Sequence, residues 1–178
     1  MDKKKVAEGI KLILEGIGVD LKNEHFVRTP ERVADFYEEI LSPKISEEDY
    51  VGFYEKSDLV IAKGIRVFSL CPHHLLPVIY EVNVAYIPKS KIVGVSKLVR
   101  VVANEASKLQ VQERFTEEIA SKLMELTSAT DVMVVVKGEH YCMKMRGVKS
   151  DSKIITSAIR GGFKEYDLRM ETLELMRG

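Results

Sequence analysis

The sequence has no excess charge of either sign and no long run of apolar residues. Its 27 basic and 27 acidic side chains cancel, so the formal net charge is zero. A general role on nucleic acid or on a membrane surface therefore has no electrostatic support. Every apolar run falls well short of the roughly 20 residues that a membrane-spanning helix needs. The hydrophobic fraction of 46% is ordinary for a globular domain.

Glycine-rich phosphate loops are also missing. The chain contains neither a G-x-x-x-x-G-K segment nor a G-x-G-x-x-G segment. Any phosphate group must therefore be held by basic side chains or by a helix N-terminus.

Cysteine is scarce, and its placement is informative. Both cysteines and three of the four histidines fall in two short segments, Cys71–His74 and His140–Cys142. Thiolate and imidazole are preferred zinc ligands, and Cys-x2-His lets two side chains reach one ion. The pattern predicts a metal site built from two distant segments. Unrelated buried thiols are the alternative, because cysteine often behaves as a small hydrophobe.

A disulfide between the two cysteines is a further alternative. The chain opens with the polar segment Met1–Lys5, and no apolar signal segment follows. We therefore expect a cytoplasmic protein. Stable disulfides are uncommon there, and Cys/His clusters more often bind a metal or take part in catalysis.

Hydrophobic periodicity predicts helices and strands in a definite order. A helical pattern covers residues 6–17, and a second begins at Thr29, read as a hydroxyl N-cap before proline. An acidic loop is expected over residues 42–56. Strands are then predicted at residues 59–70, 81–87, 92–95, 132–136 and 154–159, and helices at 96–109 (capped by Ser96), 112–126 and 165–176.

The main elements after residue 59 thus follow the order β-β-α-α-β-β, preceded by two helices. Antiparallel strands that flank a helix pair indicate an α+β fold rather than a doubly wound sheet. A chain of 178 residues is long enough for one domain with a full-sized core.

Six motifs resemble GTP cyclohydrolase I. They are Thr29–Ala34 (TPERVA), Cys71–Pro77 (CPHHLLP), Val84–Pro88 (VAYIP), Gly94–Leu98 (GVSKL), Leu109–Arg114 (LQVQER) and His140–Gly147 (HYCMKMRG). The resemblance covers nearly the whole chain and implies the tunnelling fold, in which subunits assemble into barrels. It implies an N-terminal helical segment over residues 1–56 and a catalytic domain over residues 57–178. It also implies a homo-oligomer, a decamer in the family, with active sites between subunits.

The resemblance implies hydrolytic ring opening of GTP, with release of formate and rearrangement to 7,8-dihydroneopterin triphosphate. It implies one zinc ion per subunit, with Cys71, His74 and Cys142 as ligands. Three protein ligands leave a fourth position for water, as in catalytic zinc sites. Such an ion supplies hydroxide near neutral pH, here for attack on C8 of guanine. A closed structural site with His73 or His140 as fourth ligand is the alternative.

The resemblance also assigns catalytic roles. His73 and His140 match the family's catalytic histidines, and imidazole can move protons near pH 7. Ser96 matches a serine placed near the ribose. Either histidine could instead only support the site from outside the ligand set.

Recognition of GTP is implied for six residues. Glu113 matches the carboxylate that accepts hydrogen bonds from N1–H and the 2-amino group of guanine, and Gln112 would help to position the base. The triphosphate would be held by basic residues, namely Lys97, Arg100 and Arg146, with Arg32 from a neighbouring subunit. Without the resemblance, we would interpret Glu113 as an acid that opens a helix, where its charge suits the helix dipole. The basic residues would be interpreted as an ordinary solvated helix face.

Three positions depart from the family pattern. Pro72 replaces the glutamate of Cys-Glu-His-His, Asn83 stands where a histidine usually precedes the VAYIP segment, and Asp35 stands where a lysine often follows Arg32. Two other functions therefore stay open. One is a divergent tunnelling-fold enzyme that acts on another guanine or pterin compound, and the other is a non-catalytic, zinc-bound binding module.

Overall fold

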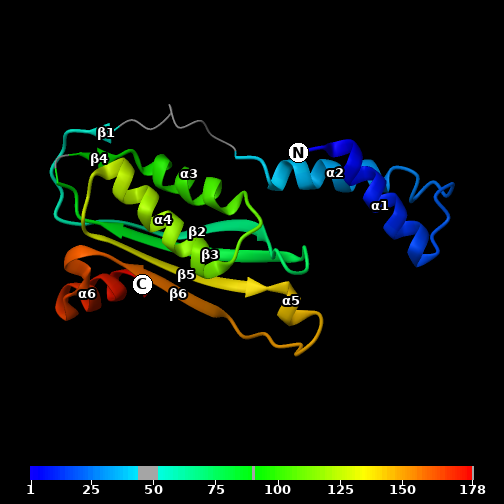
Figure 1. The fold of residues 1–178 in the computed structure, drawn as a ribbon. Coiled ribbons are helices and arrows are strands. Elements are labelled where there is room, and N and C mark those ends of the chain that lie inside the picture. Colours follow the sequence, from blue (N-terminus) through cyan, green and yellow to red (C-terminus); the bar gives the residue numbers. More distant parts are fainter. Residues whose placement is uncertain (44–51, 90, 178) are drawn as a thin grey trace. The chain divides into compact units, whose positions relative to one another are not determined.

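The chain folds as two compact units, Met1–Ser42 and Pro43–Gly178 (Figure 1). The computed structural model describes residues 1–43, 52–89 and 91–177. Most of the expected acidic loop, residues 44–51, lies outside the described residues. Among the helices that are described, none is both long enough and apolar enough to cross a membrane.

The N-terminal unit is a pair of helices, α1 (Lys3–Ile17) and α2 (Thr29–Ile40), that pack against each other. The Asp2 side chain caps α1 by accepting a hydrogen bond from the Lys5 N–H. Gly18 closes this helix in the left-handed region, with φ of 88°. The helix expected over residues 6–17 is thereby confirmed.

The expected hydroxyl N-cap at Thr29 is wrong. Thr29 already belongs to α2, whose N-cap is Arg28 without a side-chain hydrogen bond. The Thr29 hydroxyl donates instead to the His25 carbonyl at 3.4 Å, in the turn before the helix. Pro30 lies in the first turn as expected, where a missing N–H costs nothing.

Asp35, one of the three departures from the family pattern, has a partner within this unit. Its carboxylate forms an ion pair with Lys3 of α1, and Glu38 pairs with the same ammonium at 3.2 Å. The Asp35 pairing is the first cause of a raised pKa at Lys3. The acid at position 35 therefore contributes to the contact between the two helices.

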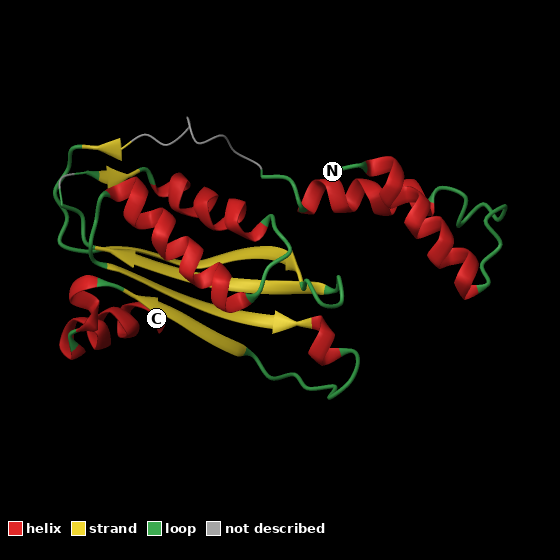
Figure 2. Ribbon diagram, viewed as in Figure 1, coloured by secondary structure: helices red, strands yellow, loops and turns green. Residues whose placement is uncertain are grey.

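The C-terminal unit contains a four-stranded antiparallel sheet with the order β2-β3-β5-β6 (Figure 2). Its strands are β2 (Val60–Leu70), β3 (Pro77–Tyr86), β5 (Val132–His140) and β6 (Ile154–Ile159). Helices α3 (Val95–Ala106) and α4 (Gln112–Thr127) cover one face. A smaller sheet pairs β1 (Gly52–Phe53) with β4 (Ile92–Val93).

The core lies on both faces of this sheet. Alternate residues of β3 are fully buried beneath the helices, namely Val78, Tyr80, Val82, Val84 and Tyr86. Each such side chain contributes on the order of 2 kcal/mol through burial. Side chains on the other face of the sheet, such as Ala85 and Met133, form a second cluster. They pack with Phe163 of the short 3-10 helix η2 (Gly161–Lys164) and with Met176 of α6 (Tyr166–Arg177).

The β-β-α-α-β-β order and the α+β class of the tunnelling fold are confirmed by this topology. The expected cap at Ser96 is wrong, because α3 begins at Val95 with Gly94 as its N-cap and without a side-chain cap bond. The short helix α5 (Tyr141–Lys144) was not predicted. Four residues are too few to show a helical period.

Asn83, a second departure, stabilises an irregularity in the sheet. Its side-chain oxygen accepts a hydrogen bond from the Gly64 N–H at 2.8 Å. The β2–β3 register shifts between Ala62 and Ile65, and Gly64 has φ of 69°. Glycine suits this left-handed position, and the amide satisfies an N–H that lies within the register shift.

Candidate metal centre and surrounding site

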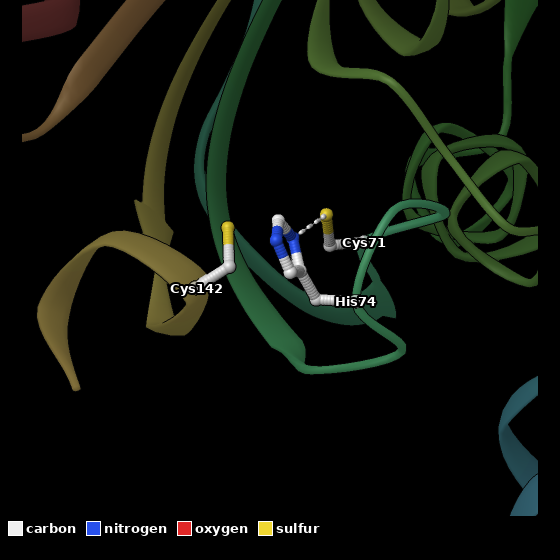
Figure 3. Close-up of side chains that lie close together, drawn as sticks. All are labelled: Cys71, His74 and Cys142. Carbon is white, nitrogen blue, oxygen red and sulfur yellow. Dashed lines mark hydrogen bonds between the residues drawn. The ribbon is translucent and has the colours of Figure 1, made fainter. Parts of the chain in front are cut away.

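Cys71, His74 and Cys142 come together at one end of the sheet (Figure 3). Their candidate ligand atoms all lie within 4.8 Å of one another. Cys71 and His74 belong to the β2–β3 hairpin, and Cys142 lies on α5 directly after β5. Pairing of Val78 with His140 brings the two segments side by side. The antiparallel register of β3 and β5 therefore assembles the group.

The hairpin turn sets the geometry of its two ligands. The Cys71 carbonyl accepts from the Leu75 N–H, and the Cys71 N–H donates to the Leu76 carbonyl, both at 2.9 Å. Leu75 closes the turn with φ of 53°. Cys71 Sγ then lies 3.8 Å from His74 Nδ1. This is close to the roughly 3.6 Å between sulfur and nitrogen ligands of one tetrahedral zinc ion.

Pro72, the third departure, occupies the first position of this turn. Proline fixes φ near the value that a turn or a first helical residue requires. Proline has no backbone N–H, and an N–H at such a position would have no hydrogen-bond partner in the turn. The residue thus restricts the segment that joins the two candidate ligands.

The donor set suits a soft divalent cation. Both cysteines are free thiols, with Cys71 buried and Cys142 half-buried. Burial, followed by the neighbouring Cys71 thiol, raises the pKa of Cys142. A bound cation favours the thiolate and opposes that shift. Two thiolates and one imidazole could therefore hold a metal ion here.

His140 lies beside this group at the end of β5. Its Nε2 is 2.8 Å from Oε1 of Gln112, the first residue of α4. Burial lowers the pKa of His140, and the negative charge of Glu113 acts in the opposite direction. The ring also meets Tyr80 edge-on, with 6.1 Å between centroids.

Other predicted site residues gather at the same end. His73 is exposed, with Nδ1 3.8 Å from Cys71 Sγ. The Arg146 Nη1 lies 2.5 Å from His74 Nε2. A bridge between Leu70 and Leu109 brings the LQVQER segment beside Cys71, so that Gln112 and Glu113 open α4 near the metal group.

The start of α3 lies at the opposite end of the sheet. The Val93 N–H, just before α3, donates to the Tyr86 hydroxyl at 3.0 Å. Tyr86 is eight residues along β3 from Val78, which is a separation of about 26 Å. The residues placed there are Ser96, Lys97 and Arg100. Arg32 is exposed on α2 of the N-terminal unit.

Tyr80 is a residue of this region that the sequence analysis missed. It is fully buried, stacked on Phe115 at 4.6 Å, and its hydroxyl has no hydrogen-bond partner within the described part of the chain. Burial, with further contributions from Cys71, Glu113 and Cys142, raises the pKa of Tyr80 far above its usual range. The strand expected over residues 81–87 in fact begins at Pro77, so the sequence placed Tyr80 outside it.

Replacing Tyr80 by phenylalanine is expected to raise the free energy of unfolding by about 1 kcal/mol, because an unpaired buried hydroxyl is removed while the stacked ring remains. Urea denaturation of the metal-free protein measures this change. Tyr86→Phe is the matched control, since its equally buried hydroxyl accepts a hydrogen bond from Val93. That variant should lose stability, and a similar loss in both would contradict the interpretation of Tyr80.

Comparison with known proteins assigns the chain to a family. The family profile described as GTP cyclohydrolase I matches residues 6–177. The chain is 42% identical to GTP cyclohydrolase 1 of Hyperthermus butylicus, over 99% of this chain and 92% of the relative. It is 48% identical to GTP cyclohydrolase 1 of Clostridium perfringens, over 93% of this chain and 92% of the relative.

A solved structure, the archaeosine synthase QueF-Like in the apo form, is 18% identical with a TM-score of 0.47. The similarity covers 58% of this chain and 96% of that chain. The family profile and the curated relatives, by contrast, both extend over nearly the whole sequence. The chain therefore belongs to the GTP cyclohydrolase I family of enzymes.

Proposed function

We propose that the chain opens the guanine ring of GTP in a zinc-dependent hydrolysis, releases formate and forms 7,8-dihydroneopterin triphosphate. The observation that supports this most is the Cys71, His74 and Cys142 group beside His140, in a member of this family. A zinc ion on three protein ligands keeps a position for water, and it supplies hydroxide near neutral pH.

The proposed proton carriers are His73 and His140. His140 is half-buried, and burial lowers its pKa, which favours the neutral imidazole, the form that can accept a proton. His73 is exposed beside Cys71, where it can reach a bound base from the solvent side. Both residues would deliver protons to the purine during attack and ring opening.

Guanine recognition is proposed for Glu113. Its carboxylate is exposed at the start of α4 and close enough to influence the pKa of both Tyr80 and His140. It can accept hydrogen bonds from N1–H and the 2-amino group, a pair that adenine does not present. The amide of Gln112 already bonds to His140 and to the sheet, so its help in placing the base would act through His140.

The triphosphate would be shared between subunits. Arg146 lies at the metal end, whereas the start of α3 is about 26 Å away along β3. We therefore propose that Ser96, Lys97 and Arg100 of a neighbouring copy complete the site. Ser96 would lie near the ribose, and Arg32 would come from a further copy. The order β2-β3-β5-β6 gives the described sheet two outer strands through which a barrel can extend. The proposed assembly is a homodecamer in the cytoplasm, where the ligand thiols stay reduced.

The direct test is to incubate the zinc-loaded protein with GTP and to follow formate together with the pterin chromophore. Formate and pterin should appear in equal amounts, and ATP should yield neither. Binding of GTP without formate would reject the full reaction. It would favour a divergent enzyme that acts on another guanine or pterin compound, or a binding module.

A further inference from the structure

The side chain of Gln112 is held in one orientation. Gln112 is only 2% exposed. Its Nε2 lies 3.2 Å from the Val136 carbonyl, 2.9 Å from the Ile154 carbonyl and 3.2 Å from the Thr156 hydroxyl. Carbonyl oxygens can only accept hydrogen bonds, so the amide nitrogen must face them. The usual ambiguity between amide nitrogen and oxygen is therefore removed by the protein itself.

This orientation determines the proton position on His140. With the nitrogen of Gln112 committed to the strands, its Oε1 is the atom that lies 2.8 Å from His140 Nε2. An amide oxygen only accepts, so His140 Nε2 must carry a hydrogen. In the neutral imidazole, Nδ1 then has the free lone pair.

We propose that Gln112 is a positioning residue for His140. It holds the imidazole as the Nε2–H tautomer through the bond between Gln112 Oε1 and His140 Nε2, and it leaves the lone pair on Nδ1 as the one that can face the substrate. The inference rests on the proposed role of His140 as a proton carrier.

The surroundings keep the amide and the ring in place. Thr116 donates to the Gln112 carbonyl at 2.8 Å, and its hydroxyl lies 2.6 Å from that of Thr156. Gly138 supplies the space between the two side chains. A Cβ at this position would collide with Gln112 Oε1 and lie 3.0 Å from His140 Nε2. The pair therefore occupies room that another residue at position 138 would remove.

Solid-state NMR of protein labelled with 13C and 15N at histidine can read the tautomer directly. The chain has four histidines, so the spectrum is simple, and a His140→Asn variant identifies the His140 signals. At about pH 8 an unperturbed imidazole is neutral. The protonated nitrogen should be the one bonded to Cδ2, which is Nε2. A proton on Nδ1 in the unmodified protein would overturn the inference.

Gln112→Met removes the amide while preserving length and apolar contact. His140 should then lose its single tautomer, and kcat with GTP should fall about 10- to 100-fold, the usual cost of losing such a supporting partner. KM should change less than kcat does, because Gln112 would act on the base only through His140. Gly138→Ala, which displaces Oε1 without altering Gln112, should give the same two effects.

Thr156→Val is the matched control. It removes one of the three partners of the amide nitrogen and leaves both carbonyls, which are enough to orient the nitrogen, so the Nε2–H tautomer should stay unchanged. An unchanged tautomer in both Gln112→Met and Gly138→Ala would refute the role of Gln112. A changed tautomer with full turnover would refute its importance for the reaction. If the unmodified protein releases no formate, the proposed reaction fails, and the NMR result alone decides whether Gln112 sets the His140 ring.

Discussion

Replacing Cys142 by alanine is expected to leave the purified protein without its metal ion and to lower formate release from GTP by at least about 1000-fold. Cys142 is the one candidate ligand on α5, and the other two lie on the hairpin. Without its thiolate, two ligands remain, which is fewer than catalytic zinc sites use. Elemental analysis of the purified protein and a formate assay measure the two effects.

Two variants from the same region make this result specific. Met145→Ala alters an exposed side chain directly after α5 and should keep the metal and the activity. His140→Ala should keep the metal while turnover falls by about 100-fold, through loss of acid–base catalysis alone. Equal metal loss in His140→Ala and Cys142→Ala would show that His140 is a ligand and that the site is closed.

Replacing Gly161 by alanine is expected to lower the free energy of unfolding by about 3 kcal/mol. Gly161 begins η2 with φ of 58°, in the left-handed region. An added Cβ would lie 2.6 Å from the Thr130 carbonyl and would collide with the Asp131 carboxylate. That carboxylate accepts a hydrogen bond from the Gly162 N–H at 2.5 Å, which would be disturbed as well.

Gly147→Ala separates backbone strain from this crowding. Gly147 has nearly the same φ, 60°, but an added Cβ would meet no atom within 4 Å. Its replacement should cost only the conformational penalty, on the order of 1 kcal/mol. Urea denaturation of both variants under the same metal conditions gives the comparison. Equal losses would mean that the contacts of Gly161 with Thr130 and Asp131 contribute nothing.

Hydrophobic periodicity predicted the helices and strands well where the buried residues recur at the regular spacing of the element. The last strand, Ile154–Ile159, has the predicted bounds, and α4 differs by a single residue at its end. Helix starts were less predictable. Thr29 and Ser96 both carry a hydroxyl suited to capping, yet both lie inside the first turn. Local sequence cannot decide between adjacent N-cap positions, because the preceding turn sets the backbone there.

The site could be predicted only in pieces. The clustering of Cys71, His74 and Cys142 indicated a metal group, but their proximity depends on the β3–β5 register, which no local pattern specifies. Tyr80 was missed because the strand was expected to begin at residue 81, whereas β3 begins at Pro77. Gln112 looked available for a ligand, since a polar residue at a helix start is usually exposed. Its amide nitrogen instead faces three oxygen atoms of β5 and β6.

The β3–β5 register also has an entropic consequence for the candidate metal centre. Cys71 and Cys142 are separated by about 70 residues, and an ion that joined them in an unfolded chain would have to close that loop. In the folded sheet, pairing of Val78 with His140 closes this loop through backbone hydrogen bonds. The sheet therefore bears the entropy cost of loop closure. Less of the binding free energy of the thiolates and the imidazole would then be spent on closing the loop, so the affinity for an ion would be higher.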